Sequence, residues 1–328
     1  MTPRRQLRAA VIGAGLMGRW HAHAIRRVGG VVRAVVDTSL EQAQALASRH
    51  HAEASTSLQP IMNSVDIVHV CTPVDSHEPL AAEAIDAGRH VLVEKPLAAT
   101  SAATRALVAR AAARGVLIAP VHQFCWQDGA QRVFASLPAL GAIRHIDFIA
   151  CSAGATSSGM DPDEVALDVL PHPLSLIARV HPQALAGPWT IHRPASGELR
   201  LTTMAGQATV SVLISMSGRP TVNALRIVAE HASARLDLFH GFAVIEPGAV
   251  SRGRKIVQPF ASAGATLVAA ASNLIARAIR QEPAYPGLRP LIAEFYAAVA
   301  ESGRAPVANE DTVAIADAID AIRATVAA

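Results

Sequence analysis

Two lysines stand out among the charged residues of this sequence. Lysine and arginine together number 29, but only Lys95 and Lys255 are lysines. Arginine stays protonated in proteins, whereas the compact ammonium of lysine changes its pKa on burial and donates from a single point. The chain uses arginine where a plain positive charge is enough, so both lysines are candidates for chemistry. Lys95 lies in the motif Glu94-Lys95-Pro96, directly after an apolar run.

A second candidate is the glycine motif Gly13-Ala14-Gly15-Leu16-Met17-Gly18 near the start of the chain. In G-x-G-x-x-G the first glycine permits a tight turn, the second lets a pyrophosphate approach the backbone, and the third lets helix and strand pack closely. The free N–H groups of the following helix then face the phosphates. These six residues are therefore predicted to bind a dinucleotide.

An acidic residue follows at the distance that this interpretation requires. Asp37 ends the second β-branched run, where a carboxylate can accept hydrogen bonds from the adenosine ribose. Thr38 and Ser39 come next, without an arginine that would bind a 2′-phosphate. The sequence therefore favours NAD as the cofactor over NADP.

The first third of the chain alternates between strand and helix patterns, which indicates βαβ units and a parallel sheet covered on both faces. Strands are expected at residues 8–13, 31–37, 65–70, 90–93 and 116–121, and helices at 16–28, 39–50, 76–87 and 102–114. The motifs above then lie at the carboxyl edge of the sheet, where open parallel sheets bind ligands. We expect an α/β Rossmann domain over residues 1–121.

The pattern changes after residue 122. Asp161-Pro162-Asp163-Glu164 is typical of a helix start. Consecutive strand patterns follow at 198–204, 208–216, 222–229 and 234–239, and three alanine-rich helices are expected from about residue 264 onward. Strands without intervening helices favour a mixed, largely antiparallel open sheet. Residues 122–328 are therefore predicted to form an α+β domain for substrate binding and oligomerisation.

The motifs taken together resemble the family of glucose-fructose oxidoreductase, inositol 2-dehydrogenase and rhizopine catabolism protein, known as the Gfo/Idh/MocA family. The resemblance is dense from Arg8 to about Val121, through VIGAGLMGRWHA and VCTPVDSHEPLAAEAIDAGRHVLVEKPLA, and beyond that it rests on Asp168 and His172. It implies that Lys95 contacts the reacting oxygen and the nicotinamide region. It also places further cofactor contacts at Cys71, Thr72, Pro73, His77 and Glu94.

The resemblance also implies that His172 is the general acid/base and that Asp168 supports it, as in the family's D-x-x-x-H element. Four residues apart on one helix, the two side chains would share a face. Pro171 and Pro173 act against a regular helix there, and Leu170 stands where the family commonly has glycine. A structural histidine is therefore the alternative for His172.

Several other residues have two interpretations. Gln123 either hydrogen-bonds the nicotinamide or the substrate, or packs at the domain junction, and Trp126 either lines the substrate pocket or packs there. His240, in the segment 237–242, and Lys255 are weaker substrate candidates, while His21 and His23 are interpreted as surface residues of the first helix. Sugar-oxidising members of the family often carry an arginine after the strand that is expected here at 116–121. In this sequence no arginine follows that strand until Arg132.

Composition excludes several classes of protein. A chain of 328 residues with 51% hydrophobic and 17% charged residues is expected to fold fully. Its net charge of +3 is scattered, which does not support nucleic-acid binding. The apolar stretches are interrupted by glycine, proline or arginine, so no membrane span is expected, and neither the histidines nor the three cysteines form a metal-binding pattern.

The sequence thus predicts a cytoplasmic NAD(P)-dependent oxidoreductase that moves a hydride between nicotinamide and a carbinol or carbonyl carbon of a small hydroxylated, possibly cyclic, substrate. Apolar residues on both alternations of the strands between 197 and 239 predict a homodimer or homotetramer through the C-terminal sheet. Two alternatives stay open: a lyase or hydrolase that uses NAD without net redox change, and an inactive dinucleotide-binding sensor or scaffold.

Overall fold

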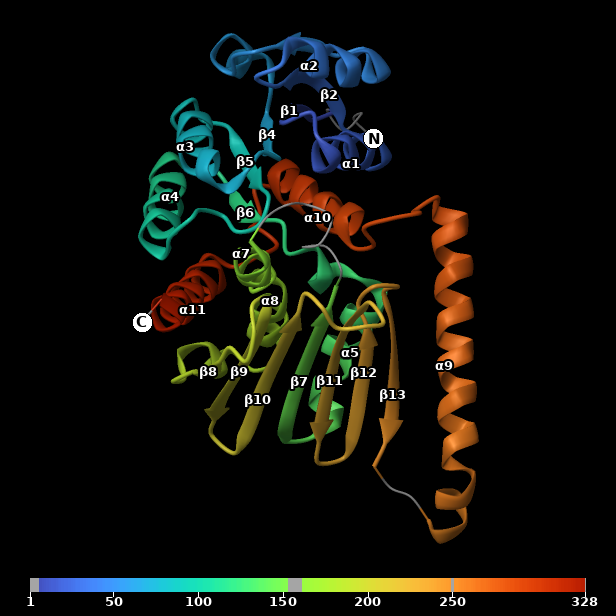
Figure 1. Cartoon of the computed structure of the whole chain (residues 1–328). Coiled ribbons are helices and arrows are strands. Elements are labelled where there is room, and N and C mark those ends of the chain that lie inside the picture. Colours follow the sequence, from blue (N-terminus) through green and yellow to red (C-terminus); the bar gives the residue numbers. More distant parts are fainter. Residues whose placement is uncertain (1–5, 153–160, 249–250, 328) are drawn as a thin grey trace. The chain divides into compact units, whose positions relative to one another are not determined.

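The computed structural model describes residues 6–152, 161–248 and 251–327 (Figure 1). The chain forms two compact units. The first comprises residues 1–122 and 288–317, and the second comprises residues 123–287 and 318–328. The segment 288–317 thus joins the N-terminal unit, whereas the sequence placed everything after residue 121 in the second domain.

The first unit contains a parallel sheet of six strands in the order β3-β2-β1-β4-β5-β6. This is the Rossmann arrangement that the sequence predicts, with β3 as a short strand that the sequence pattern did not indicate. The strands are β1 (Arg8–Ile12), β2 (Val31–Val36), β3 (Glu53–Ser55), β4 (Ile67–Val70), β5 (His90–Val93) and β6 (Ile118–Pro120). The helices that connect them are α1 (Leu16–Arg27), α2 (Leu40–Ala47), α3 (His77–Asp86) and α4 (Ser101–Arg114).

The sheet forms because its central strands are largely apolar and buried. Every residue of β4 is buried, as are all but the first of β1 and β5, which is the pattern of parallel strands covered on both faces. Strands β1, β4 and β5 are neighbours and run in the same direction. The residues that follow them, Gly13, Cys71 and Glu94, are therefore brought to one edge of the sheet.

Helix α10 (Leu288–Glu301) packs against α1, although it follows the second unit in sequence. Its Leu291, Ile292 and Phe295 are fully buried. Gly30 allows the close approach, because a Cβ at this position would lie 2.6 Å from the Tyr296 ring. This packing is the reason that residues 288–317 belong to the first unit.

The second unit contains a sheet of seven strands in the order β13-β12-β11-β7-β10-β9-β8. Only β7 and β10 are parallel to each other, so the predicted mixed, largely antiparallel sheet is confirmed. The central strand β7 was not among the predicted strands. The strands are β7 (Ile143–Cys151), β8 (Thr190–His192), β9 (Glu198–Ala205), β10 (Ala208–Ser215), β11 (Val222–Ala229), β12 (Ala232–Asp237) and β13 (Phe242–Pro247).

The helices that begin in or belong to the second unit are α5 (Asp128–Leu140), α7 (Pro162–Asp168), α8 (Pro171–Val180) and α9 (Arg252–Arg280). The last helix, α11 (Asn309–Ala327), is divided between the units at residue 317. Asp161 caps α7 as predicted, because its side chain accepts a hydrogen bond from the N–H of Asp163. Helix α9 begins twelve residues earlier than expected, and its Lys255–Arg280 segment is long and apolar enough to cross a membrane by length and composition alone. The sequence expectation of interrupted apolar stretches overlooked it, because Pro259 and Gly264 do not end this helix.

Candidate active site

The glycine motif forms the turn between β1 and α1 that its spacing predicts. Gly13 has φ +93°, and a Cβ there would lie 2.6 Å from the carbonyl oxygen of Cys71. A Cβ on Gly18 would lie 1.8 Å from the carbonyl oxygen of Gly13, so only glycine lets the helix approach the strand. At Gly15, the N-cap of α1, a Cβ would meet nothing within 4 Å.

The three glycines therefore separate into two kinds. Gly13 and Gly18 are required by contacts inside the protein, whereas no contact inside the described chain requires Gly15. Gly15 lies where the helix N-terminus presents its N–H groups, and Leu16 and Met17 beside it are exposed and half-buried. This geometry fits the close approach of a cofactor pyrophosphate.

Asp37 directly follows β2 and is fixed by two backbone donors. The N–H of Ala14 donates to its Oδ2 at 2.7 Å, and the N–H of Ser39 donates to its Oδ1 at 2.9 Å. The carboxylate thus holds the glycine turn in place, a role that the sequence did not predict. Each oxygen keeps a lone pair for a ribose hydroxyl, and Thr38 beside it is exposed.

The loops after β4 and β5 are joined by His77, which is almost fully buried. Its Nδ1 lies 2.8 Å from the carbonyl oxygen of Pro96, and its Nε2 lies 2.8 Å from that of Thr72. Carbonyl oxygens only accept, so the ring is the donor toward these two loops. His77 therefore holds the Lys95-Pro96 segment against the loop that contains Cys71, Thr72 and the exposed Pro73.

Glu94 is held by a buried chain of hydrogen bonds that begins on α10. The Tyr296 hydroxyl lies 3.0 Å from Nε2 of His69, the Nδ1 atoms of His69 and His21 are 2.9 Å apart, and Nε2 of His21 lies 2.9 Å from Oε1 of Glu94. The second carboxylate oxygen, Oε2, accepts the N–H of Lys95 at 3.3 Å. His21 is fully buried, so its interpretation as a surface residue is wrong: α1 packs on β1, β2 and β4, and His21 lies on its buried side.

The proton positions in this chain follow from the ionisable groups. Burial lowers the pKa of His69 well below its usual value, so this ring is neutral, and burial raises the pKa of the Tyr296 hydroxyl, which keeps its proton. The arrangement that satisfies every atom has Tyr296 donating to His69, His69 donating to His21, and His21 donating to the carboxylate of Glu94. The chain thus supports the carboxylate that holds the backbone of Lys95.

His122 is a residue of this region that the sequence analysis missed. It follows β6, is almost fully buried, and its Nδ1 has no hydrogen-bond partner among the described residues. Burial, followed by the nearby charge of Lys95, lowers the pKa of His122 to about 4. A neutral imidazole thus lies near the candidate catalytic lysine. Its position directly after a parallel strand was the one signal that could have identified it.

The predicted acid/base pair lies in the second unit, on two helices instead of one. Asp168 ends α7, and His172 lies in the first turn of α8. Asp168 is exposed and forms an ion pair with Arg323 at 3.9 Å, while the ring of Phe124 stacks on His172 with centroids 4.4 Å apart. The break at residues 169–170 means that the expected shared helical face does not form. The catalytic roles of both residues, and their approach to Lys95, stay predictions.

The remaining candidates of the second unit divide into buried and exposed residues. Gln123 is buried, and its Oε1 has no hydrogen-bond partner among the described residues, so this amide can still serve a ligand. Trp126 is buried in the unit. His240 is exposed in the turn between β12 and β13, where Asp237 accepts from both its N–H and its ring. Lys255 is exposed in the first turn of α9.

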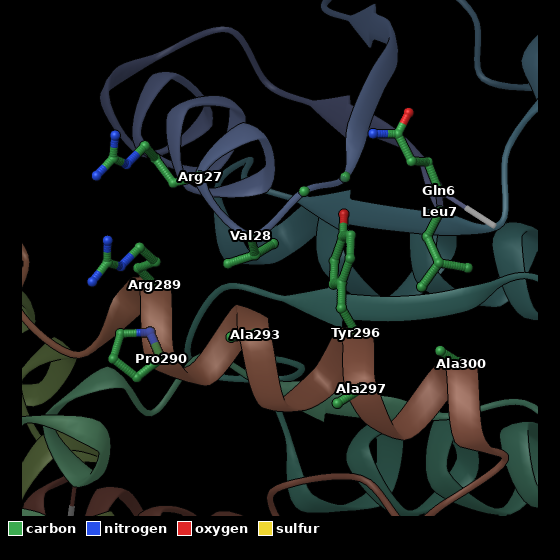
Figure 2. A pocket seen from close by; sticks show the side chains of 12 residues that line it. Gln6, Leu7, Arg27, Val28, Arg289, Pro290, Ala293, Tyr296, Ala297 and Ala300 are labelled. Carbon is green, nitrogen blue, oxygen red and sulfur yellow. The ribbon is translucent and has the colours of Figure 1, made fainter. Parts of the chain in front are cut away.

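A hollow of about 570 Å³ in the first unit lies between the end of α1 and α10 (Figure 2). Arg27, Arg289 and Tyr296 are among its lining residues, and no predicted site residue is. Within the described chain, no group of three or more His, Cys, Asp or Glu side chains is placed to hold a metal ion. The first-unit candidates therefore gather at the carboxyl edge of the sheet and do not line this hollow.

Comparison with known proteins also indicates the N-terminal region as the NAD-binding part of the chain. The model of an oxidoreductase family with an NAD-binding Rossmann fold, GFO_IDH_MocA, matches residues 7–122. UDP-N-acetylglucosamine 3-dehydrogenase of Acidithiobacillus ferrooxidans is 29% identical over 237 residues, which is 69% of this chain and 69% of that protein. Inositol 2-dehydrogenase 4 of Saccharopolyspora erythraea is 40% identical over 116 residues, about a third (34%) of either chain.

Solved structures extend the likeness to the whole fold. Levoglucosan dehydrogenase in complex with NADH and levoglucosan superposes with a TM-score of 0.78 and 18% identity, covering 98% of both chains. The UDP-N-acetylglucosamine 3-dehydrogenase of A. ferrooxidans superposes with a TM-score of 0.76 and 19% identity, covering 98% of this chain. At such identities the likeness establishes the fold. Residues 7–122, which the family model matches, are an NAD-binding Rossmann domain of the Gfo/Idh/MocA oxidoreductase type, and the likeness of the whole chain to these dehydrogenases is one of fold.

Proposed function

We propose that this enzyme transfers a hydride between a nicotinamide cofactor and a carbinol or carbonyl carbon of a small hydroxylated substrate. The observation that carries the proposal is the position of Lys95. It is one of two lysines in the chain, it directly follows Glu94 at the carboxyl edge of the Rossmann sheet, and buried hydrogen bonds fix the segment on both sides. The named activities of the relatives, oxidation of an inositol or of a UDP-sugar, support a cyclic hydroxylated substrate.

The residues of the first unit fit an NAD molecule. The N-terminus of α1 beside Gly15 would hold the pyrophosphate, Asp37 would accept from the ribose hydroxyls, and the loop with Thr72 and His77 would border the nicotinamide. Bound NAD supplies the carbon that accepts or donates the hydride. NAD is preferred over NADP, because the Asp37 carboxylate would repel a 2′-phosphate.

Lys95 would donate a hydrogen bond to the substrate oxygen and so stabilise the alkoxide that develops as the hydride leaves. His172 would take the hydroxyl proton, and Asp168 would support it through a contact that forms with the substrate present. The neutral His122 near Lys95 adds no second positive charge to this region, so the ammonium remains the main cation presented to the alkoxide.

We further propose a cytoplasmic homodimer or homotetramer that uses the sheet of the second unit. Along β10, Val210, Val212 and Ile214 are buried in the unit, while Thr209 is exposed and Ser211 and Leu213 stay half-buried. An accessible sheet face with apolar residues such as Leu213 supports association there.

The test of the activity uses Lys95→Arg and Lys95→Ala, with Lys255→Arg as the matched control. If Lys95 donates to the reacting oxygen, the larger planar guanidinium cannot occupy the same point, and both variants lose on the order of 10²-fold or more in turnover. NAD affinity falls much less, because the glycine turn and Asp37 remain. Lys255→Arg reports whether a lysine-to-arginine change is tolerated at the other lysine, which is exposed in the first turn of α9.

Candidate substrates are cyclic polyols and nucleotide sugars, and the readout is single-turnover formation of NADH. Near wild-type turnover in Lys95→Arg would remove the lysine from the reaction. Product formation without net NADH would instead identify a lyase or hydrolase, and NAD binding without any turnover across the panel would identify a sensor.

A further inference from the structure

Helix α9 is packed on the second unit with its polar side inward. It lies beside the edge strand β13 (Figure 1). Ser262 donates to the carboxylate of Glu246, Thr266 accepts from Arg235 at 3.4 Å, and the amide of Asn273 donates to the carbonyl oxygen of His240 at 2.9 Å. Polar side chains, which an ordinary surface helix presents to water, thus face the protein in α9.

The opposite side of α9 is apolar and exposed. Eight large side chains on it each have more than half of their surface accessible, the lowest value being 52%: Ile256, Val257, Phe260, Leu267, Val268, Leu274, Ile275 and Ile279. Together they leave on the order of 1,000 Å² of apolar surface, compared with about 300–600 Å² for the largest patch on a typical monomer. A protein that is stable in water must cover a surface of this size.

The outward face has the shape of a groove between two ridges. At 3.6 residues per turn, Phe260, Leu267 and Leu274 form one ridge, and Val268 and Ile275 belong to the other. Between them, also spaced by seven, lie the small residues Gly264, Ala271 and Ala278. A Cβ on Gly264 would meet nothing within 4 Å, so no contact inside the described chain requires glycine there.

A glycine inside a helix destabilises the helix relative to alanine. Close approach of another helix is the ordinary use of such a position, since a ridge of large side chains can then enter the groove. The pattern is nearly symmetric about Leu267, with Phe260 and Leu274 equally far from it. Two copies of α9 running antiparallel about a twofold axis at Leu267 would place Leu267 against Leu267 of the other copy and Phe260 against Leu274, and the small residues of both helices would let the backbones approach closely.

The charges at the C-terminal end of α9 favour a protein over a lipid surface as the occupant. Membrane-surface helices carry cations along the border of their apolar face. Here Arg277 donates to the carbonyl oxygens of His240 and Pro283, both at 2.9 Å, and Arg280 pairs with Asp128 at 2.6 Å. The cations at this end of the helix are thus directed to the protein, and the exposed area matches the about 800 Å² per partner of a stable interface.

We propose that a second copy of this chain covers the outward face of α9, the two helices packing antiparallel with Leu267 at the twofold axis. This interface is separate from the sheet face named above and does not depend on the catalytic proposal.

The first experiment measures self-association of the full chain by sedimentation velocity between about 0.1 and 100 μM. In Leu267→Glu two carboxylates would face each other across the axis, and like charges in an interface cost several kcal/mol, so the dissociation constant of this association step rises at least about 100-fold. Leu40→Glu, an exposed leucine at the start of α2, is the control and associates as the wild type does. Wild-type association in Leu267→Glu, or a wild type that is monomeric throughout, would overturn the proposal.

A second experiment tests the register without relying on a charged variant. Under oxidation, Leu267→Cys forms a disulfide dimer with itself, whereas Phe260→Cys and Leu274→Cys form one efficiently only when mixed. The wild type, with its three free cysteines, reports the background. Self-linking of Phe260→Cys, or no gain over background in Leu267→Cys, contradicts antiparallel pairing. Binding of a monomeric wild type to vesicles with 30% anionic phospholipid would assign the face to a membrane instead.

Discussion

The buried His122 predicts how the stability of the first unit depends on pH. Its pKa is about 4 in the folded protein, lowered from the ordinary 6.5 first by burial and then by Lys95, while Glu94 acts in the opposite direction. The folded state keeps His122 neutral, whereas the unfolded chain takes up a proton below about pH 6.5. The unfolded state therefore binds more protons, and stability falls as the pH drops from 6.5 towards 4.

The size of the effect follows from the two pKa values. The difference between the two pKa values corresponds to a loss of about 3 kcal/mol in the free energy of unfolding, which is complete below pH 4. About 2 kcal/mol of this loss falls between pH 7 and pH 5. Replacing His122 by glutamine removes this contribution. The free energy of unfolding of His122→Gln should therefore change by about 2 kcal/mol less between pH 7 and pH 5 than that of the wild type.

The assay is urea unfolding at both pH values, followed by hydrogen exchange of peptides from β5 and β6 so that the first unit is measured by itself. Comparing pH differences cancels the fixed cost of each substitution. His23→Gln, an exposed histidine on α1, serves as control. In Lys95→Ala the pKa of His122 rises, so the pH effect shrinks but does not vanish. An unchanged pH effect in His122→Gln would refute the assignment of His122 as a buried neutral base.

Three further predictions concern the first unit. Tyr296→Phe removes a buried hydroxyl from His69 and should lower the free energy of unfolding by about 1–3 kcal/mol in a urea titration; no loss would mean that the hydrogen-bonded chain is not formed. Asp37→Ala should weaken NAD binding and narrow its preference over NADP in calorimetric titrations, and an unchanged preference would contradict a ribose contact. Gly15→Ala should fold normally by circular dichroism yet lose at least about tenfold in NAD affinity. Gly18→Ala should instead destabilise the protein, because its Cβ would overlap the backbone of Gly13. Equal behaviour of the two variants would contradict the division of the glycines into two kinds.

The Rossmann unit, its glycine turn and the position of Lys95 could be predicted from the amino-acid sequence alone. These features depend on local pattern: apolar strands alternating with helices fix a parallel sheet, and the residues that follow the strands must then lie at one edge. Gly13 and Gly18 could be identified because their roles are set by backbone geometry within a few residues. Lys95 could be identified as a candidate from composition, because a chain with 27 arginines uses arginine for plain positive charge and its two lysines are then candidates for chemistry.

Features that depend on contacts between distant segments could be seen only in the folded structure. His21 resembled a surface residue until α1 placed it against Glu94, 73 residues away, and Tyr296 could not be connected with His69 across 227 residues of sequence. The inward-facing polar side of α9 was hidden for the same reason. Helical periodicity shows that a helix has an apolar face and a polar face, but only the packing on β13 shows that the polar face is the one turned inward.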